Sequence, residues 1–339
     1  MTAGTAEGLF RGAVTFAQFG TDGGVVPGGR VTDGPALPWR GLSLDVVRCF
    51  FTVEEVRKVV DLLALYKFNV LHLHLTDSQA WRLEITARPR LTEGSEHYTR
   101  DDYREIVAYA AARFVTVVPE IDMPGHVLAA VRAYPELGGA QEPAHPLIPF
   151  LDPRAETTWT FVAEVLGEVA ALTPGPYLHI GGDEAFGMPE EAYAEFVARA
   201  LEVARATGKQ VVGWQEVSRS GALTAHDLAQ CWAGEGDAFD AEAARRDAPE
   251  KYHPLIDVVA RSFERAPYDV PAAVRAGAEV LASPSRVLYL DRRYAEPSVS
   301  PEQDDRRERV GFASYRPRTC EEYFDWTPGE LAEIPEGPG

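Results

Sequence analysis

The chain has 339 residues, of which 45% are hydrophobic and 10% aromatic, so it can bury one large core. Asp and Glu number 52 against 33 Lys and Arg, and the net charge of -19 disfavours binding to nucleic acid or to an anionic membrane. No apolar run is long enough to span a bilayer, and residues 1–20 lack a secretion-signal pattern. The cysteines, which are few and lack metal-binding spacing, are Cys49, Cys231 and Cys320. We therefore expect a cytoplasmic protein in a reducing compartment.

Short β-branched runs alternate with helical patterns along the chain. Helical spacing of apolar residues predicts helices over Val53–Tyr66, Arg100–Phe114, Thr157–Leu172 and Pro189–Thr207, and Thr99 is the expected N-cap of the second. Seven runs predict strands, which are Leu42–Val47, Asn69–Leu75, Val115–Ile121, Tyr177–Ile180, Gln210–Gly213, Leu228–Cys231 and Glu279–Ala282. The alternation predicts an α/β fold of the TIM-type (β/α)8 barrel class. The first strand has no Gly-x-Gly-x-x-Gly turn after it, which disfavours a dinucleotide-binding open sheet.

The barrel is predicted to lack or replace its eighth strand. We assign residues 1–30 to an N-terminal segment, 31–334 to the catalytic barrel with a helical excursion at about 234–273, and 335–339 to a disordered tail. The run Phe312–Tyr315 is too short and too close to Pro317 for a central strand. Unpaired strand edges attract other chains, so we expect a second copy, as a homo-oligomer, or a segment such as Ala13–Phe19 to cover the gap.

Two adjacent carboxylates follow the strand Tyr177–Ile180. Gly181 and Gly182 let the backbone turn tightly there, and Asp183 and Glu184 come next. Barrel enzymes keep catalytic groups just beyond the carboxyl ends of strands, and neighbouring carboxylates repel so that one tends to hold its proton. The pair therefore predicts acid–base chemistry. The alternative is an exposed pair that caps the following helix.

Two tryptophans and two histidines also lie on or just after predicted strands. Trp214 and Trp232 follow matching strand ends, which favours a shared apolar pocket over ordinary core or rim packing. His72 and His74 lie on one face of a strand, an arrangement that binds metal in amidohydrolase-like barrels. That alternative needs another histidine pair and a bridging lysine or carboxylate, whereas the later strands end in acids and tryptophans. We expect no metal and no cofactor.

Four segments, in this order, resemble the family 20 glycoside hydrolases, which are β-N-acetylhexosaminidases. They are Trp39–Arg48, Tyr66–Asp77 with Trp81–Arg82, Pro119–His126 and His179–Glu184. The resemblance extends over roughly Leu9–Pro328, and Gly8–Gly12 resembles only the end of a small α/β domain that precedes the barrel in many relatives. It implies hydrolysis of terminal, non-reducing β-linked N-acetylglucosamine or N-acetylgalactosamine, with retention and with the substrate's own acetamido oxygen as nucleophile.

The resemblance also implies roles for residues around the cleaved bond. Glu184 would protonate the leaving oxygen and later activate water, and Asp183 would orient the acetamido N–H and stabilise the positive intermediate. Tyr289 would donate its hydroxyl to the acetamido oxygen, the alternative being a rim tyrosine. Trp214 and Trp232 would enclose the acetamido methyl group.

Further residues would bind the sugar ring or set the proton affinity of the acid. Arg48 would bind the 3- and 4-hydroxyls, the alternative being an ion pair within the barrel mouth, and Asp291 would bind the outer ring edge. Asp77 would fix His126, which in turn would contact the general acid. Either residue of that pair could instead be a satisfied polar side chain.

Three segments depart from the family pattern. Arg48 is followed by Cys49 where the family commonly has histidine, and Asp77–Trp81 differs from the usual Asp-Asp-Gln-Gly-Trp. Tyr323–Pro328 resembles the segment before strand eight, and the family's strand-eight tryptophan and glutamate have no counterpart before Gly339. A second hypothesis is therefore a degenerate barrel that binds amino sugars without efficient turnover.

Overall fold

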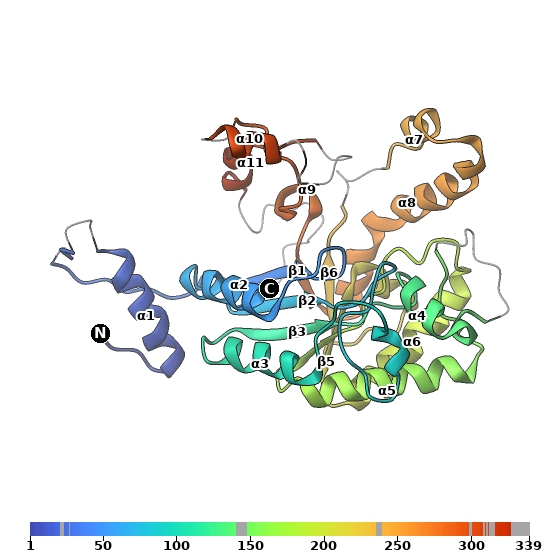
Figure 1. Cartoon of the computed structure of the whole chain (residues 1–339), viewed down its shortest axis with the longest axis horizontal. Coiled ribbons are helices and arrows are strands. Elements are labelled where there is room, and N and C mark those ends of the chain that lie inside the picture. The colour runs from blue at the N-terminus through green and yellow to red at the C-terminus, as the bar shows by residue number, and fades with distance from the viewer. Residues whose placement is uncertain are drawn as a thin grey trace. The chain divides into compact units, whose positions relative to one another are not determined.

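The computed structural model describes residues 1–20, 24–26, 28–139, 148–234, 239–297, 300–307, 309, 311 and 316–326. The chain divides into two compact units. Unit 1 comprises Met1–Gln141, Leu147–Ile180 and Glu202–Lys209, and unit 2 comprises Glu142–Pro146, Gly181–Leu201 and Gln210–Gly339. Each unit contains parallel strands and helices, so the α/β class predicted from the sequence is confirmed (Figure 1).

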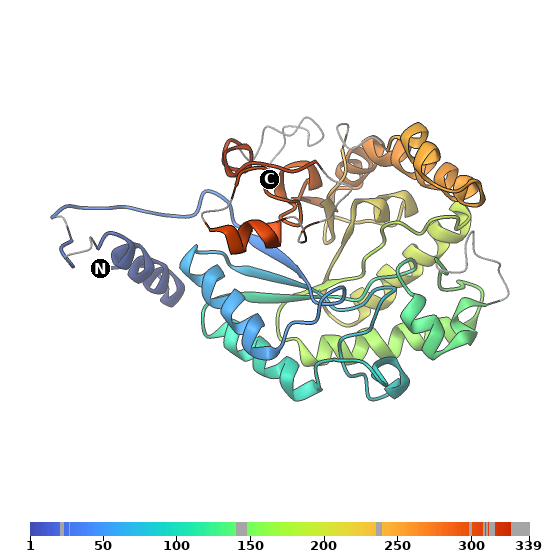
Figure 2. The same cartoon turned by 45° about the horizontal axis from the view of Figure 1, so that its top comes forward.

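Unit 1 contains four parallel strands that pair in chain order. They are β1 (Gly41–Asp45), β2 (Val70–His74), β3 (Thr116–Glu120) and β4 (Tyr177–His179). The helices of this unit are α1 (Ala6–Gln18), α2 (Val53–Leu65), α3 (Arg100–Ala111), α4 (Leu128–Ala133) and α5 (Glu156–Leu172), with short 3-10 helices η1 (Pro89–Thr92) and η2 (Pro135–Gly138). Figure 2 shows α2 and α3 side by side along the strands. An ion pair between Arg57 and Glu105, 3.1 Å apart, links these two helices.

Unit 2 contains three parallel strands, again paired in chain order. They are β5 (Gln210–Trp214), β6 (Leu228–Cys231) and β7 (Glu279–Ala282). The other elements are η3 (Gln215–Ser220), α7 (Ala241–Asp247), η4 (Glu250–Tyr252), α8 (His253–Arg275), α9 (Ser285–Leu288), α10 (Pro301–Arg307) and α11 (Cys320–Phe324). Helix α6 (Glu190–Ala206) begins in unit 2 and ends in unit 1. In the described part of the chain, no strand follows β7.

All seven predicted strands are present, with ends that differ by at most two residues from the prediction. The four predicted helices are present as α2, α3, α5 and α6. Thr99 caps α3 as predicted: its hydroxyl accepts from the Asp102 backbone N–H, and the Asp102 carboxylate accepts from the Thr99 backbone N–H. This reciprocal pairing satisfies two backbone donors that the helix itself leaves unpaired, which explains why the sequence places the helix start so well.

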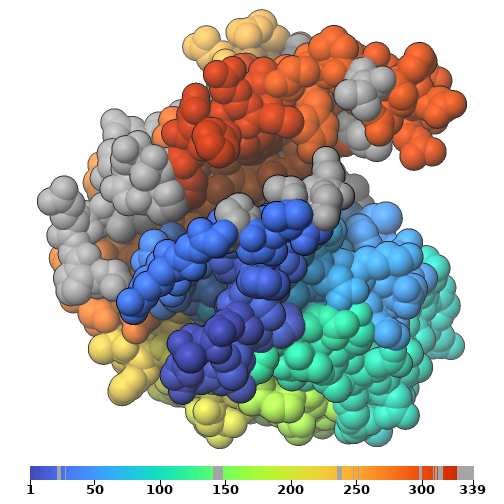
Figure 3. All heavy atoms as spheres, turned by 90° about the vertical axis from the view of Figure 1, so that its left-hand side faces the viewer, coloured from blue at the N-terminus to red at the C-terminus, as the bar shows by residue number. Residues whose placement is uncertain are grey.

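The N-terminal segment forms a helix that packs on unit 1 near the starts of its strands. The Arg11 guanidinium donates to the Phe114 carbonyl at 2.8 Å, the rings of Phe10 and Phe114 are 5.5 Å apart, and Gln18 donates to the Leu65 carbonyl. Figure 3 shows this helix, in dark blue, on that face. The run Ala13–Phe19, which we expected to cover an open edge, lies mostly within α1, and its Gln18 binds the segment that leads into β2.

The remaining predictions concern the excursion, the C-terminal segments and the cysteines. The range 234–273, predicted as an excursion, includes α7 and most of α8, whereas Phe312–Tyr315 and the tail 335–339 lie outside the described residues. Cys49 and Cys320 are exposed and Cys231 is buried, all as free thiols. Among the described residues, none of the helices has the length and apolarity needed to cross a membrane.

Candidate active site

One layer of polar side chains crosses the sheet of unit 1. The strand register aligns Asp45 of β1 with His74 of β2, His74 with Glu120 of β3, and Glu120 with His179 of β4. Aligned residues on parallel strands point to the same face, so these side chains meet. His74, Glu120 and His179 are buried, and the Glu120 side chain has no exposed surface. The loops that follow β1, β2 and β3 add Arg48, Asp77 and His126.

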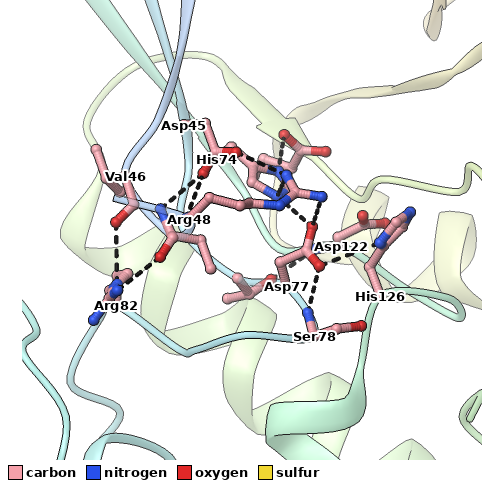
Figure 4. A network of polar contacts seen from close by, with 12 residues as sticks. Asp45, Val46, Arg48, His74, Asp77, Ser78, Arg82, Asp122 and His126 are labelled. Atoms are coloured by element: carbon pink, nitrogen blue, oxygen red, sulfur yellow. Dashed lines mark hydrogen bonds and ion pairs between the residues drawn. The ribbon is translucent and has the colours of Figure 1, made fainter. Parts of the chain in front are cut away.

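Arg48, Asp77 and His126 lie together in this unit (Figure 4). The Arg48 guanidinium contacts one Asp77 oxygen at 2.6 Å, and His126 Nδ1 lies 3.2 Å from the other. The first oxygen also lies 2.9 Å from His74 Nε2, and the second accepts from the Ser78 backbone N–H. Both Asp77 oxygens are therefore occupied by donors, while the Arg48 side chain remains 46% exposed and can reach a ligand.

The loop that carries Arg48 is held by Arg82. Its guanidinium donates to the Val46 carbonyl at 3.0 Å and to the Val47 carbonyl at 2.7 Å. Asp45 binds the backbone N–H groups of Val47 and Arg48 and also accepts from the Arg48 side chain at 2.8 Å. Arg48 thus makes the ion pair that was its alternative interpretation, and the same pairing fixes the direction of its guanidinium fork.

The neighbours of Asp77 decide its protonation state. Burial alone would raise the pKa of its carboxyl, but hydrogen bonds from His126 and His74, together with the charge of Arg48, hold that pKa well below its ordinary range. Asp77 is consequently a carboxylate over the physiological pH range. It accepts a hydrogen bond from His126 Nδ1, which fixes the imidazole orientation and leaves Nε2 as the nitrogen that can gain or lose a proton.

Several imidazoles and carboxylates of unit 1 lie close enough to surround a cation. The sets include His72, Glu120 and His179, whose candidate ligand atoms lie within 4.8 Å of one another. His72 Nε2 is 2.8 Å from Glu120, which is a hydrogen-bonding distance, and the rings of His72 and His179 stack at 4.5 Å. The lone pairs of stacked rings lie in separate, nearly parallel planes, which is a poor arrangement for binding one ion, so we interpret this set as a hydrogen-bonded cluster rather than a metal centre.

Unit 2 presents the two acids that follow β4 on a constrained backbone. Gly182 has φ 108°, and a Cβ there would lie 2.4 Å from a methyl group of Val217, so no larger residue fits. The Gly182 carbonyl accepts from the Tyr193 hydroxyl at 2.6 Å, and the Gly181 carbonyl accepts from the Trp214 N–H. Glu184 itself has φ 48°, in the left-handed region that costs an L-residue energy and is common at functional sites. His126 of unit 1 is similarly placed, at φ 54°.

Trp232 is fixed by two neighbouring residues of η3. The side-chain Oε1 of Gln215 accepts from the backbone N–H groups of Trp232 and Ala233 at 2.9 and 3.0 Å, and its side-chain Nε2 donates to the Ala266 carbonyl. The Trp232 indole N–H lies 3.1 and 3.2 Å from the two oxygens of Glu216. Gln215 and Glu216 are both buried. The backbone and the indole of Trp232 are therefore held independently.

Glu216 of unit 2 has a strongly perturbed acidity. Burial and the nearby charge of Asp183 raise its pKa to about 8, and Arg219 opposes this only partly. Arg219 already forms a two-point ion pair with Asp269, with contacts of 2.8 and 2.6 Å. Glu216 therefore carries a proton near neutral pH, next to one of the two predicted catalytic acids.

The remaining predicted site residues lie at or after the ends of the three strands of unit 2. Helix α9 separates β7 from Tyr289, whose carbonyl accepts from the Tyr323 hydroxyl at 2.8 Å. Tyr289 is half-buried and Asp291 is exposed. Trp214 is the last residue of β5 and is buried, whereas Trp232 directly follows β6 and is half-buried.

Sequence reasoning overlooked three residues that organise these clusters. Glu120 is the only acidic residue of the predicted strand Val115–Ile121. An acid inside a mostly apolar strand could have indicated a buried charge. Gln215 and Glu216 adjoin Trp214 but carry no periodic signal of their own. Their function depends on contacts with Trp232, which is distant in sequence.

Comparison with known proteins identifies what this chain is similar to. The model of the glycosyl hydrolase family 20 catalytic domain matches residues 37–194. A β-N-acetylhexosaminidase of Cellulomonas fimi is 37% identical over 349 residues, covering 97% of this chain and 62% of the relative. The chain thus spans less than two thirds of the length of that curated relative.

Two solved structures extend the comparison. One, described as a glycoside hydrolase family 20 β-N-acetylglucosaminidase, has a TM-score of 0.76 at 36% identity and covers 96% of this chain and 68% of its own. The other, a mutant Streptomyces plicatus β-hexosaminidase in complex with its product GlcNAc, has a TM-score of 0.79 at 34% identity and covers 98% and 64%. These similarities confirm the fold class that the sequence predicted.

Proposed function

Because the chain belongs to glycoside hydrolase family 20, we propose that it removes terminal, non-reducing β-linked N-acetylglucosamine or N-acetylgalactosamine, with retention and by substrate assistance. The observation that carries this proposal is the pair Asp183 and Glu184, released by two glycines after β4, with Glu184 on a left-handed backbone. The GlcNAc bound to the Streptomyces plicatus enzyme supports the same sugar class for this chain.

The proposed chemistry needs one proton donor and one group that orients the acetamido function. Glu184 protonates the departing oxygen while the acetamido oxygen attacks the anomeric carbon, and Glu184 then takes a proton from the incoming water. Asp183 accepts from the acetamido N–H and offsets the positive charge that develops on the ring formed by this attack. Tyr289 donates to the acetamido oxygen, and Trp214 and Trp232 enclose its methyl group.

Unit 1 supplies the groups that bind the sugar and tune proton transfer. The fork of Arg48 is fixed by Asp45 and Asp77 and retains exposed donors for the 3- and 4-hydroxyls. Asp77 orients His126, whose Nε2 can then exchange a proton with the acid. Asp291, which is exposed, binds hydroxyls on the outer edge of the ring.

Turnover of nitrophenyl β-N-acetylglucosaminide and β-N-acetylgalactosaminide by the purified chain tests the proposal. We expect hydrolysis of both, with the β-anomer of the free sugar as the first product seen by NMR. The alternative candidate, a barrel that binds amino sugars without efficient turnover, predicts GlcNAc binding by calorimetry and no release of nitrophenol. Absence of both binding and turnover would overturn both candidates.

The nucleophile is tested separately with a thiazoline ring fused across the anomeric carbon and C2. This compound mimics the intermediate formed by acetamido attack, and such analogues bind about 10²–10⁸-fold more tightly than substrate. We expect competitive inhibition far below the substrate KM. Weak inhibition, combined with hydrolysis of glucosides that lack the acetamido group, would contradict substrate assistance.

A further inference from the structure

We propose that His74 is a doubly protonated bridge between Asp77 and the buried Glu120, and that His74 and Glu120 are positioning residues that keep Asp77 anionic and directed at His126. The inference deepens the proposed function and rests on it only for its kinetic consequences. The three groups that it joins are brought together by the strand register, in which His74 is aligned with Glu120, and by the loop that carries Asp77 after β2.

The geometry determines the protonation of His74. Its Nδ1 lies 2.7 Å from a Glu120 oxygen, and its Nε2 lies 2.9 Å from an Asp77 oxygen. A carboxylate only accepts hydrogen bonds, so both ring nitrogens must carry a proton for both bonds to form. A neutral imidazole has a single N–H and would leave one short contact between two acceptors.

The charges that face His74 favour the same state. Glu120 of β3, Asp77 of the loop after β2 and Asp122 of the loop after β3 are all buried carboxyl groups. Arg48, a cation from the loop after β1, also pairs with these carboxylates. Its guanidinium lies 3.2 Å from His74 Nε2 and by itself opposes a proton there, but the three carboxyl groups outnumber it. Buried carboxylates are costly unless opposite charge accompanies them, so a second cation among these groups is stabilising.

The acidity of the groups agrees with this arrangement. Burial would lower the pKa of His74, but the charge of Glu120 and hydrogen bonds to Asp77 and Glu120 raise that pKa well above its ordinary value. Burial would raise the pKa of Glu120, but the neighbouring imidazoles, His74 foremost, hold it well below its ordinary value. The proton therefore belongs to the imidazole rather than to Glu120.

The bridge has a consequence for His126. One Asp77 oxygen is taken by Arg48 and His74, which leaves the other to accept from His126 Nδ1 and from the Ser78 backbone N–H. If His74 lost its proton, Asp77 would lose a donor and a positive charge and would gain a proton more easily. A protonated Asp77 could donate to His126 and reverse its tautomer, so that Nδ1 rather than Nε2 would be the nitrogen without a proton.

Nitrogen NMR of the full chain with ¹⁵N-labelled histidine tests the protonation directly and needs no activity. His74 is assigned by comparison with His74→Gln, and the exposed His226, assigned with His226→Gln, is the internal reference. We expect both His74 nitrogens to remain protonated from about pH 5 to about pH 8, and His226 provides the reference signals of a solvent-exposed ring in the same spectra. A His74 with one bare nitrogen at pH 7 would overturn the proposal.

Glu120→Gln provides the kinetic test, with Glu93→Gln as the matched control because Glu93 is an exposed glutamate of the same unit. Removal of the Glu120 charge should convert His74 to a neutral ring at pH 7 and lower kcat by about 10–100-fold, as when the hydrogen-bonded partner of a functional histidine is lost. KM should change less than kcat, and the acid limb of kcat/KM should move to higher pH because Asp77 then titrates more easily.

Each outcome either supports or overturns the bridge. An equal loss of kcat at every pH, with an unshifted acid limb, would indicate a structural role only and would overturn the positioning role. If Glu120→Gln does not fold, the wild-type spectrum still decides the protonation of His74. If the chain hydrolyses no glycoside, the proposed function fails, whereas a doubly protonated His74 would still establish the bridge.

Discussion

Asp77 in unit 1 and Glu216 in unit 2 are both buried carboxyl groups, yet they hold their protons oppositely. Asp77 is surrounded by donors from Arg48, His74 and His126, which outweigh burial and keep it ionised. Burial and the like charge of Asp183 raise the pKa of Glu216 to about 8, because the nearby guanidinium of Arg219 is committed to Asp269 and opposes them only partly. The sign of the neighbours, rather than burial itself, decides which carboxyl group is an anion.

The largest effect should come from removing the proposed acid in unit 2. Glu184→Gln cannot transfer a proton, and general acid catalysis is worth about 10²–10⁴-fold. We expect a loss of that size for substrates with poor leaving groups, and a much smaller loss for nitrophenyl substrates, whose leaving group needs no proton. The exposed Glu191→Gln is the control. Equal losses for the two substrate types would show that Glu184 is not the acid.

Neutralising the anion of unit 1 should destabilise the fold. Asp77→Asn leaves Arg48 and His74 without their carboxylate, and breaking a buried ion pair costs about 3–5 kcal/mol. The folded pKa of Asp77 is depressed, so its stabilisation is present above the unfolded value of about 4 and is lost as pH falls below it. Urea unfolding should therefore separate the variant from wild type strongly at pH 7 and less at pH 3. The same separation at both pH values would contradict an ionised Asp77.

Neutralising Glu216 should instead stabilise the fold. Its folded pKa of about 8 lies above the ordinary carboxyl value, so the folded state retains a proton that the unfolded chain releases, and stability falls as pH rises between these values. Glu216→Gln removes this penalty and still offers an acceptor to Trp232. We expect the variant to be about 1–3 kcal/mol more stable than wild type at pH 8 and nearly equal at pH 5, by urea unfolding. A variant that is less stable than wild type at pH 8 would contradict a raised pKa for Glu216.

The sequence predicted the strands of both units because their signals are local. Val115–Ile121 and Gln210–Gly213 are short runs that contain β-branched residues. The N-cap Thr99 is recognisable because its partner Asp102 lies only three residues further along the chain. The class of fold follows from the alternation of such runs with amphipathic helices. The observed ends of the elements differ slightly from the predicted ends, because they depend on caps and on packing.

The organisation of the site could be predicted less well from the sequence, because it depends on strand register and on backbone strain. Asp77 and His126 were predicted to meet only through a family resemblance, whereas the strand register that aligns Glu120 with His74 becomes visible only in the structure. The left-handed backbone of Glu184 and His126 is likewise imposed by the surrounding fold, and neither residue is a glycine that would mark it in the sequence.

The smallest effect should come from the hydrogen bond between Trp232 and Glu216. Trp232→Phe keeps an aromatic ring against Phe263, which contacts the indole edge to face at 5.7 Å, but it removes the N–H donor to Glu216. Below pH 7 the acceptor is a neutral carboxyl group, so the loss should be about 0.5–1.5 kcal/mol. Above pH 8 the acceptor is a carboxylate, whose hydrogen bonds are worth about 1.5–3 kcal/mol, so the loss should grow with pH.

Urea unfolding of wild type and Trp232→Phe at pH 6 and pH 9 measures this growth, and Trp214→Phe is the control for loss of an indole in the same unit. Because the lost donor favours the ionised form, the pKa of Glu216 in Trp232→Phe should rise further. The stability difference should then grow from the wild-type pKa of about 8 and level off above the higher pKa of the variant. If the difference between the two proteins were the same at pH 6 and pH 9, Glu216 would not change its charge in that interval. Unit 2 would then hold an anion beside Asp183, as unit 1 does at Asp77, and the contrast between the two clusters would fail.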